Sequence, residues 1–320
     1  MPHSQFCAMT RVDEFTLINQ EYTMFTGLSA FPLTPVTAAG FDEQGFITIL
    51  NRIRAASADS IGVLGSTGSY AYLTREQRRY IAHLAKAQAD NIPVMVCVGA
   101  ISTDEVLRLA DDAQAAGADA LLLPPVSYQR LRDDEVFGLF ETLTQHVSVP
   151  VCIYDNPGTT HFEFSDELLE RIAGLACIKS VKIPGVPASL EDAVARVQRL
   201  KQKLPESVTI GISGDASAAT GLNAGCEVWY SVCGGLFPHV AKEITDAAAR
   251  GERERVTQLG ERLSPLWALF RRHGGSIRVM AAAAGVLGLT DVDCLPRPIR
   301  PLSASDIAEV AAVMRELNLT

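Results

Sequence analysis

Short apolar runs alternate with helical patterns along most of this chain, and this alternation restricts the possible folds more than any other feature. Eight of the runs are expected to be strands, and they recur about every thirty residues, the size of a βαβ unit. They cover 27–33, 61–66, 93–100, 119–125, 149–156, 177–184, 208–214 and 228–233. Helical patterns lie between them, such as one opened by Thr74 with Gln77 three residues later, a capping-box signature. The repetition predicts a parallel sheet covered by helices.

The number of repeats predicts that this sheet closes into a barrel. Eight strand–helix units fit a (β/α)8 TIM barrel, which takes about 250 residues. An open, doubly wound sheet is the alternative, but no G-x-G-x-x-G segment follows a strand. After residue 235 only helices are expected, at 239–250, 252–272, 276–289 and 304–318. We therefore expect an N-terminal extension (1–26), a catalytic barrel (27–238) and a C-terminal helical extension packed on the barrel (239–320).

Composition argues against several classes of protein. The net charge of −9 argues against a nucleic-acid-binding protein, and no apolar run reaches the roughly 18 residues of a membrane span. Residues 1–25 mix charges among their apolar positions, which is not the pattern of a secretory signal. The seven cysteines form no C-x-x-C pair and the six histidines no H-x-x-x-H pair, so we expect no metal site. Buried free thiols are expected at Cys97, Cys152, Cys177 and Cys233, in a reducing, cytoplasmic location.

The sixth predicted strand, "CIKSVKIP", carries two lysines in a core sequence, although lysine is rarely buried without a reason. Because alternate strand residues face opposite sides, Ser180 and Lys182 are expected to face the barrel interior. Cys177 and Lys179 share the other face, and Lys179 can extend to the bottom rim. Lys182 lies near the C-terminal end of the strand, where barrel enzymes keep their active sites. It is either half of a buried ion pair or a desolvated amine able to form a Schiff base.

Other polar residues gather at predicted strand ends. The segment "GSTG", from Gly65 to Gly68, is either a plain turn or a loop whose backbone N–H groups bind an anion. Tyr154, in "YDNPG", either packs at an edge or takes part in catalysis. Gly214 belongs to "SGD", which ends the seventh strand and could simply cap a helix. A lysine, a tyrosine and an anion loop at one barrel mouth predict imine chemistry on a small 2-oxo acid.

These residues resemble those of the dihydrodipicolinate synthase/N-acetylneuraminate lyase family of class I aldolases, from about Gly27 to the C-terminus. The resemblance implies a (β/α)8 barrel with C-terminal helices. It implies that Lys182 is the Schiff-base lysine and that Tyr154, 28 residues earlier, is the proton-shuttling tyrosine. It also implies that Ser66 and Thr67 hold the pyruvate carboxylate. No metal or organic cofactor is implied beyond the covalent imine through Lys182, and the assembly implied is a homotetramer built from dimers.

The chain departs from the family pattern at several positions. Ser69 and Tyr70 follow the anion loop, where the family usually continues with Glu. Thr159 stands where the synthases have an arginine for the carboxylate of the acceptor aldehyde. "PPVSY" shifts Tyr128 by one position from the tyrosine that the synthases borrow from a neighbouring subunit. Tyr230, on the eighth strand, replaces a smaller aliphatic side chain and either narrows the donor site or packs.

We therefore expect a Schiff-base lyase or aldolase that joins or cleaves pyruvate, or a close 2-oxo acid, and an aldehyde. A threonine hydroxyl cannot replace a bidentate ion pair, so a sugar-acid-type or hydroxy-2-oxo-acid substrate is favoured. Arg130 or Arg132 could supply a substitute charge. The alternatives are an authentic dihydrodipicolinate synthase that uses aspartate semialdehyde, and a non-catalytic 2-oxo-acid-binding barrel. Residues 1–26 lie outside the family pattern. They are either an arm that lies on a partner subunit or an upstream segment, with translation starting at Met24.

Overall fold

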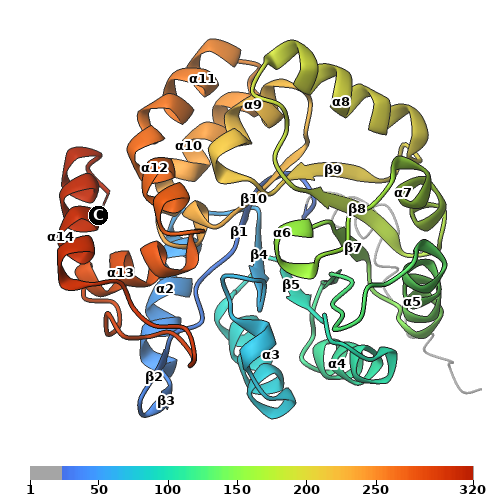
Figure 1. The fold of residues 1–320 in the computed structure, drawn as a ribbon, viewed down its shortest axis with the longest axis horizontal. Helices are drawn as coiled ribbons and strands as arrows, with labels where there is room; N and C mark the ends of the chain where they lie inside the picture. The colour runs from blue at the N-terminus through green and yellow to red at the C-terminus, as the bar shows by residue number, and fades with distance from the viewer. Residues whose placement is uncertain (1–23, 320) are drawn as a thin grey trace, which may run out of the picture.

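The computed structural model describes residues 24–319, and its centre is a closed barrel of eight parallel strands (Figure 1). The strands follow one another around the barrel in chain order, and β1 closes it by pairing with both β4 and β10. The barrel strands are β1 (Gly27–Ala30), β4 (Ser60–Val63), β5 (Val94–Cys97), β6 (Ala120–Leu123), β7 (Val151–Tyr154), β8 (Ile178–Ile183), β9 (Thr209–Ile212) and β10 (Val228–Ser231). The predicted (β/α)8 fold is confirmed, and the open sheet is wrong.

A ring of helices surrounds the strands (Figure 1). Its members are α2 (Glu43–Ala55), α3 (Arg75–Gln88), α4 (Thr103–Ala115), α5 (Asp133–His146), α7 (Asp166–Ala173), α8 (Leu190–Lys203), α9 (Ala218–Asn223) and α10 (Pro238–Ala249). Short elements follow four of the strands: η1 (Tyr70–Tyr72), α6 (Pro157–Thr160), η2 (Asp215–Ser217) and η3 (Cys233–Gly235). The predicted capping box of α3 is present, since Thr74 Oγ1 accepts from the Gln77 N–H and the Gln77 side chain accepts from the Thr74 N–H.

The C-terminal helices group on one side of the barrel, at the left of Figure 1. They are α11 (Arg253–Arg262), α12 (Ser264–Arg272), α13 (Ile277–Val286) and α14 (Ala304–Glu316). The single helix predicted over 252–272 is wrong, because the chain breaks into two helices at Leu263. Pro265 lies at the start of α12, where a residue without an N–H group is tolerated, but it would disrupt a continuous helix. The two-stranded hairpin β2 (Val36–Thr37) and β3 (Gly40–Phe41) was not predicted.

Several smaller expectations can be compared with the fold. Residues 1–23 of the predicted extension lie outside the described part, whereas Met24 and Phe25 are buried in the core. Cys97, Cys152 and Cys233 are buried free thiols, as predicted. Cys177 is only half-buried and adopts a left-handed backbone (φ 65°), so β8 begins one residue later than expected. Between residues 24 and 319, no helix has both the length and the apolar character needed to cross a bilayer.

Candidate active site

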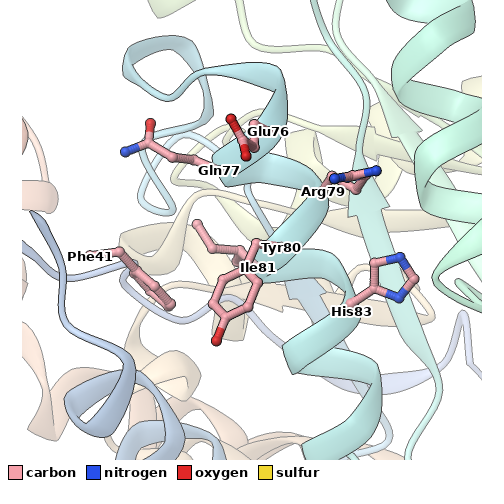
Figure 2. Close-up of a pocket in the computed structure, with 7 residues that line it drawn as sticks. All are labelled: Phe41, Glu76, Gln77, Arg79, Tyr80, Ile81 and His83. Carbon is pink, nitrogen blue, oxygen red and sulfur yellow. The ribbon is translucent and has the colours of Figure 1, made fainter.

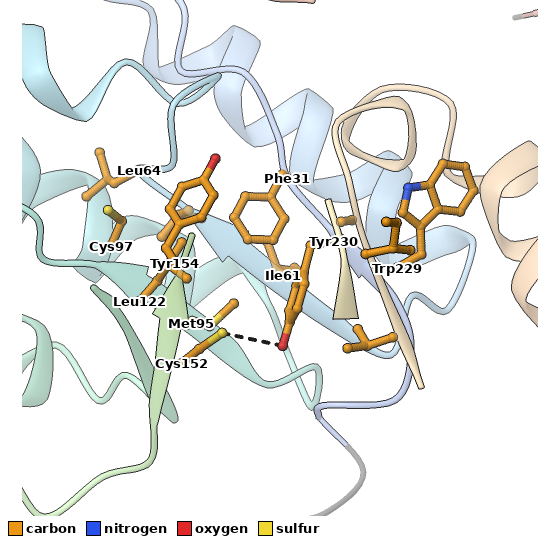
Figure 3. Packing of buried hydrophobic residues seen from close by; sticks show 14 of the residues in the cluster. Phe31, Ile61, Leu64, Met95, Cys97, Leu122, Cys152, Tyr154, Trp229 and Tyr230 are labelled. Atoms are coloured by element: carbon orange, nitrogen blue, oxygen red, sulfur yellow. Dashed lines mark hydrogen bonds between the residues drawn. The ribbon is translucent and has the colours of Figure 1, made fainter. Parts of the chain in front are cut away.

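Strand β8 carries Lys182 into the barrel interior, where the side chain is surrounded by aromatic rings. The residue is 3% exposed, and its Nζ lies 3.7 Å from the ring centre of Phe31 and 4.2 Å from that of Tyr154. A third ring, that of Tyr230, is centred 5.5 Å away. Figure 3 shows these three rings facing the same part of the core. No ion pair of Lys182 occurs among the described residues, so they do not support the buried ion pair.

This environment changes the acid–base behaviour of the lysine. Burial lowers the pKa of Lys182 from 10.5 to about 8, and the nearby Cys152, Cys97 and Asp215 oppose the shift only in part. A pKa near 8 leaves about a tenth of the side chain as neutral amine at pH 7. The neutral amine is the nucleophile that attacks a carbonyl. Three residues earlier, Lys179 is only half-buried.

Tyr154 ends β7 directly opposite Lys182 in the strand register. Its Oη lies 3.3 Å from Ser66 Oγ and accepts a hydrogen bond of 3.0 Å from Asn156 Nδ2. Burial raises the pKa of the Tyr154 phenol well above its ordinary value, and the Ser66 hydrogen bond opposes that change. The fold therefore brings together the predicted lysine, tyrosine and serine. A phenol beside an amine in this arrangement can donate and accept protons during imine chemistry.

The "GSTG" loop joins β4 to η1 and lies against Phe31. A Cβ at Gly65 would lie 2.9 Å from the Phe31 ring, and a Cβ at Gly68 would lie 2.9 Å from the Leu64 backbone, so both close approaches require glycine. Within the described chain, the N–H groups of residues 66–68 have no hydrogen-bond partner. The hydroxyl of Thr67, a residue only 6% exposed, also has none. Adjacent free donors of this kind suit a carboxylate.

The other predicted binding residues differ in their positions. Gly214 packs between Ser217 and Gly185, where the chain leaves β9 and β8. Thr159 is exposed, on α6, and its Oγ1 accepts a hydrogen bond from Asn156. Tyr128 is 87% exposed and has no hydrogen bond in the described chain, so within one protomer it does not reach the buried phenol of Tyr154.

Tyr230 packs inside the barrel rather than at its mouth. The residue is fully buried, and its ring meets that of Phe31 edge-on, with centres 5.9 Å apart. Its Oη lies 2.6 Å from Ser180 Oγ and accepts from the thiol of Cys152 at 3.5 Å. Ser180 precedes Lys182 by two residues on β8, so this pair occupies the layer of side chains below the lysine.

Three neighbours of the site were missed from the sequence. Phe31 follows β1 directly and supplies the ring nearest to Lys182. Asn156 lies in the "YDNPG" segment without a role predicted for it, although its amide joins Tyr154 to α6. Asp215 ends the "SGD" segment, and its carboxylate caps no helix, because it accepts from Trp229 Nε1 and the Cys233 N–H instead. Burial raises the pKa of Asp215 to about 6. The only available signal was that each residue lies in the last part of a predicted strand or directly after it.

Other surface features lie apart from the lysine. An open groove of about 550 Å³ runs along the outer side of α3 (Figure 2). Its lining residues are Phe41, Glu76, Gln77, Arg79, Tyr80, Ile81 and His83, none of which contacts Lys182. Among residues 24–319, no cluster of three or more His, Cys, Asp or Glu side chains is arranged to bind a metal.

Comparisons with known proteins agree with this geometry. A family model described as the dihydrodipicolinate synthetase family matches residues 24–317. A 4-hydroxy-tetrahydrodipicolinate synthase from Bartonella tribocorum is 29% identical over 292 residues, which are 88% of this chain and 94% of that protein. One from Phenylobacterium zucineum is 29% identical over 303 residues, 92% of this chain and 98% of that protein.

Solved structures extend the comparison. The crystal structure of dihydrodipicolinate synthase from Agrobacterium tumefaciens superposes with a TM-score of 0.88 at 44% identity, over 93% of this chain and 99% of that chain. The enzyme from Aquifex aeolicus superposes with a TM-score of 0.84 at 22% identity, over 92% and 99% of the two chains. At 22% identity, the likeness to the Aquifex aeolicus enzyme concerns the fold alone.

Proposed function

The chain belongs to the dihydrodipicolinate synthetase family of lyases and aldolases, and we propose that it forms a Schiff base between Lys182 and pyruvate or a close 2-oxo acid. The observation that carries this proposal is the burial of Lys182 between two aromatic rings, without an ion pair in the described chain and with a pKa near 8. The amine attacks the ketone carbon, and water leaves as the imine forms. No metal or organic cofactor takes part.

The other site residues have distinct roles in this proposal. The free N–H groups of the "GSTG" loop and the Thr67 hydroxyl bind the carboxylate of the 2-oxo acid. As the imine forms, the Tyr154 phenol gives its proton to the oxygen that leaves as water. In the cleavage direction, the resulting phenolate takes the proton from the substrate hydroxyl two carbons beyond the imine carbon. The C–C bond next to that hydroxyl breaks, its electrons enter the imine to give an enamine, and an aldehyde leaves. Protonation of the enamine and hydrolysis of the imine release the 2-oxo acid.

We propose a substrate whose aldehyde half is neutral and hydroxylated, such as a 4-hydroxy-2-oxo acid or a 2-keto-3-deoxy sugar acid. The side of the site beyond Tyr154 carries an amide, on Asn156, and a hydroxyl, on Thr159, rather than a cation. Arg132 is paired with Asp134 and Glu135. Neither polar group replaces a bidentate ion pair with an acceptor carboxylate.

The remaining arginine of that loop lies in a different environment. Arg130 lines a separate polar pocket of about 500 Å³ with His161 and Glu163, and none of the site residues lines that pocket. Arg130 therefore lines this neighbouring pocket rather than the site around Lys182 and Tyr154.

A synthase that condenses pyruvate with aspartate semialdehyde is the second candidate, favoured by the names of the relatives at 29% identity. A substrate panel distinguishes the two. Release of pyruvate is measured for 4-hydroxy-2-oxo acids and 2-keto-3-deoxy sugar acids, beside the condensation with aspartate semialdehyde. We expect the highest kcat/KM for a cleavage reaction; a higher kcat/KM for the condensation would establish the synthase.

Borohydride trapping tests the covalent step itself. Reduction in the presence of pyruvate should add one reduced pyruvate to the protein, located on Lys182 by peptide mass spectrometry. Lys179, on the same strand, is the internal control and should stay unmodified. If no lysine of the folded protein is modified, the proposal is wrong and a non-catalytic 2-oxo-acid-binding barrel is favoured.

We also propose that the protein works as a cytoplasmic homotetramer, a dimer of dimers, as the family resemblance implies. In such an assembly the 87% exposed Tyr128 is available to a neighbouring subunit. Light scattering coupled to size-exclusion chromatography measures the mass of the particle, and a monomer would contradict the proposal.

A further inference from the structure

The amide of Asn156 connects the two sides of the candidate site. Its Nδ2 lies 3.0 Å from Tyr154 Oη and 3.1 Å from Ser66 Oγ. The same atom lies 2.6 Å from Thr159 Oγ1. The backbone is anchored independently, because the Asn156 carbonyl accepts the N–H groups of Thr159 and Thr160, both at 3.0 Å. The side chain is therefore held at the end of β7, within reach of three oxygens.

The chemistry of an amide nitrogen gives these contacts a direction. An amide NH2 group only donates hydrogen bonds, so the phenol oxygen of Tyr154 accepts from it. The phenolic hydrogen is then left to point toward Ser66 or a bound substrate. A donor aimed at the phenol oxygen also stabilises the ionised phenol, whereas burial of the ring disfavours it.

We propose that Asn156 is a positioning residue for the acid–base tyrosine. It holds the phenol of Tyr154 with its hydrogen directed into the site, and it stabilises the oxygen once that hydrogen has left. An amide does not ionise in the physiological range, so Asn156 itself carries no proton. The inference rests on the proposed function, and it assigns to this chain a hydrogen bond on the phenol that does not come from another subunit.

A purely structural role for the side chain makes different predictions. The side chain of Asn156 accepts no hydrogen bond from an N–H group of α6, and within the described chain its one hydrogen bond with that helix is to Thr159 Oγ1. The backbone carbonyl of Asn156 accepts the N–H groups of Thr159 and Thr160, so the helix start should persist when the amide is replaced. A structural role would lower the melting temperature and leave the pH dependence of turnover unchanged.

The test uses two nearly isosteric variants of the full-length protein. Asn156→Leu removes the donor, and Asn156→Asp replaces it with an acceptor that binds the phenolic hydrogen. Asn51→Leu, an exposed position on α2, controls for the same chemical change elsewhere. We measure the pH profile of kcat and the KM with the best cleavage substrate of the panel, with borohydride trapping on Lys182 alongside.

In Asn156→Leu we expect kcat at pH 7 to fall about tenfold or more, because general acid–base catalysis as a whole contributes roughly 10²–10⁴-fold. The limb of the profile on which kcat rises with pH should move to higher pH. A phenol oxygen that accepts no hydrogen bond ionises less readily. KM should change less than about threefold, and the Lys182 adduct should persist, because neither depends on the proton-transfer step. Asn156→Asp should lose more activity than Asn156→Leu.

The results distinguish a failure of the role proposed for Asn156 from a failure of the proposed function. If the wild-type protein and Asn156→Leu both form the adduct, and Asn156→Leu shows a fall in kcat below about tenfold or an unshifted pH profile, the role of Asn156 alone is overturned. No adduct in the wild-type protein overturns the proposed function and this inference together. If Asn156→Leu does not fold, as judged by its circular dichroism, the isosteric Asn156→Asp decides by the same two criteria.

Discussion

Two tyrosine–serine pairs lie inside the barrel, in adjacent layers of side chains. Tyr154 and Ser66, from β7 and the loop after β4, have their oxygens 3.3 Å apart. Tyr230 and Ser180, from β10 and β8, have theirs 2.6 Å apart. Both rings lie beside Lys182, yet Figure 3 shows the two hydroxyl groups pointing in opposite directions along the barrel.

The surroundings of the two hydroxyl groups explain the difference in role. The upper phenol contacts two groups that come from loops, Ser66 and Asn156, at the end of the barrel where substrates enter. The lower phenol is enclosed by strand residues, and its partner Ser180 also accepts a hydrogen bond from Thr209 at 2.8 Å. Position along the strand, rather than the type of residue, therefore separates a proposed catalytic pair from a packing pair.

The largest effect on activity is expected when the lysine beside both rings is removed. Lys182→Met should abolish the borohydride adduct and the turnover, because Lys182 supplies the one amine between the rings among residues 24–319. The fold should not be weakened at neutral pH, since lowering the pKa of a lysine from 10.5 to about 8 costs roughly 3 kcal/mol of stability. The melting temperature and the adduct are both measured.

The sign of this stability effect can be checked with pH. The folded pKa of Lys182 lies below that of the unfolded chain, so burial of the charge destabilises the protein below about pH 8. The advantage of Lys182→Met should shrink as pH rises from about 8 toward 10.5. Lys179→Met is the matched control and should show neither the loss of the adduct nor this pH dependence. A Lys182→Met variant that retains turnover would contradict the covalent mechanism.

Removing the upper hydroxyl tests the proposed catalytic pair directly. Tyr154→Phe keeps the ring beside Lys182 and deletes the acid–base group, so kcat should fall about 10²–10⁴-fold. The imine should still form with pyruvate, although more slowly. Steady-state kinetics and circular dichroism measure turnover and folding in the same preparation. Near-normal kcat with the true substrate would remove Tyr154 from the mechanism.

The pH dependence of trapping reports on the amine beside the two rings. Because a pKa near 8 makes the neutral fraction rise through that pH, the initial rate of adduct formation should increase about tenfold between pH 7 and pH 9 and then level off. Initial rates are followed by mass spectrometry with cyanoborohydride. A rate that still climbs steeply at pH 10 would indicate a lysine with an ordinary pKa.

The position of the upper site was predictable from the sequence because short-range rules determine it. The two-residue period of a strand gives Lys182 its face, and the chain order of the parallel strands places it at the barrel mouth with Tyr154. The depth of Tyr230 was not predictable, because it depends on the register of β10 against distant strands. The amide contacts of Asn156 depend on the single turn of α6, which leaves no periodic pattern. The break at Leu263 was missed because the apolar spacing continues across it.

The anion loop, from Gly65 to Gly68, belongs to the upper layer with Tyr154 and Ser66. A change in this loop should therefore affect substrate binding without affecting the lower pair, Tyr230 and Ser180. Thr67→Val keeps the shape of a buried side chain and removes a hydroxyl that has no partner in the described chain. A hydrogen bond to a charged group is worth about 1.5–3 kcal/mol, so KM for the 2-oxo acid should rise about tenfold or more. The melting temperature should change little. An unchanged KM would move the carboxylate site elsewhere.

The smallest effect on turnover is expected for the lower hydroxyl. Tyr230→Phe leaves the ring against Phe31 and removes the partner of Ser180 and Cys152. Ser180 keeps its bond to Thr209, so the loss should be about 1–2 kcal/mol of folding free energy, or roughly 2–4 °C of melting temperature per kcal/mol.

With the ring still beside Lys182, kcat should stay within about threefold of the wild-type value, since no proton of the reaction passes through the lower layer. Calorimetry and steady-state kinetics on the Tyr154→Phe and Tyr230→Phe variants then give opposite patterns, one losing turnover and the other stability. If Tyr230→Phe loses as much kcat as Tyr154→Phe, the lower pair takes part in proton transfer, and the separation of the two layers fails.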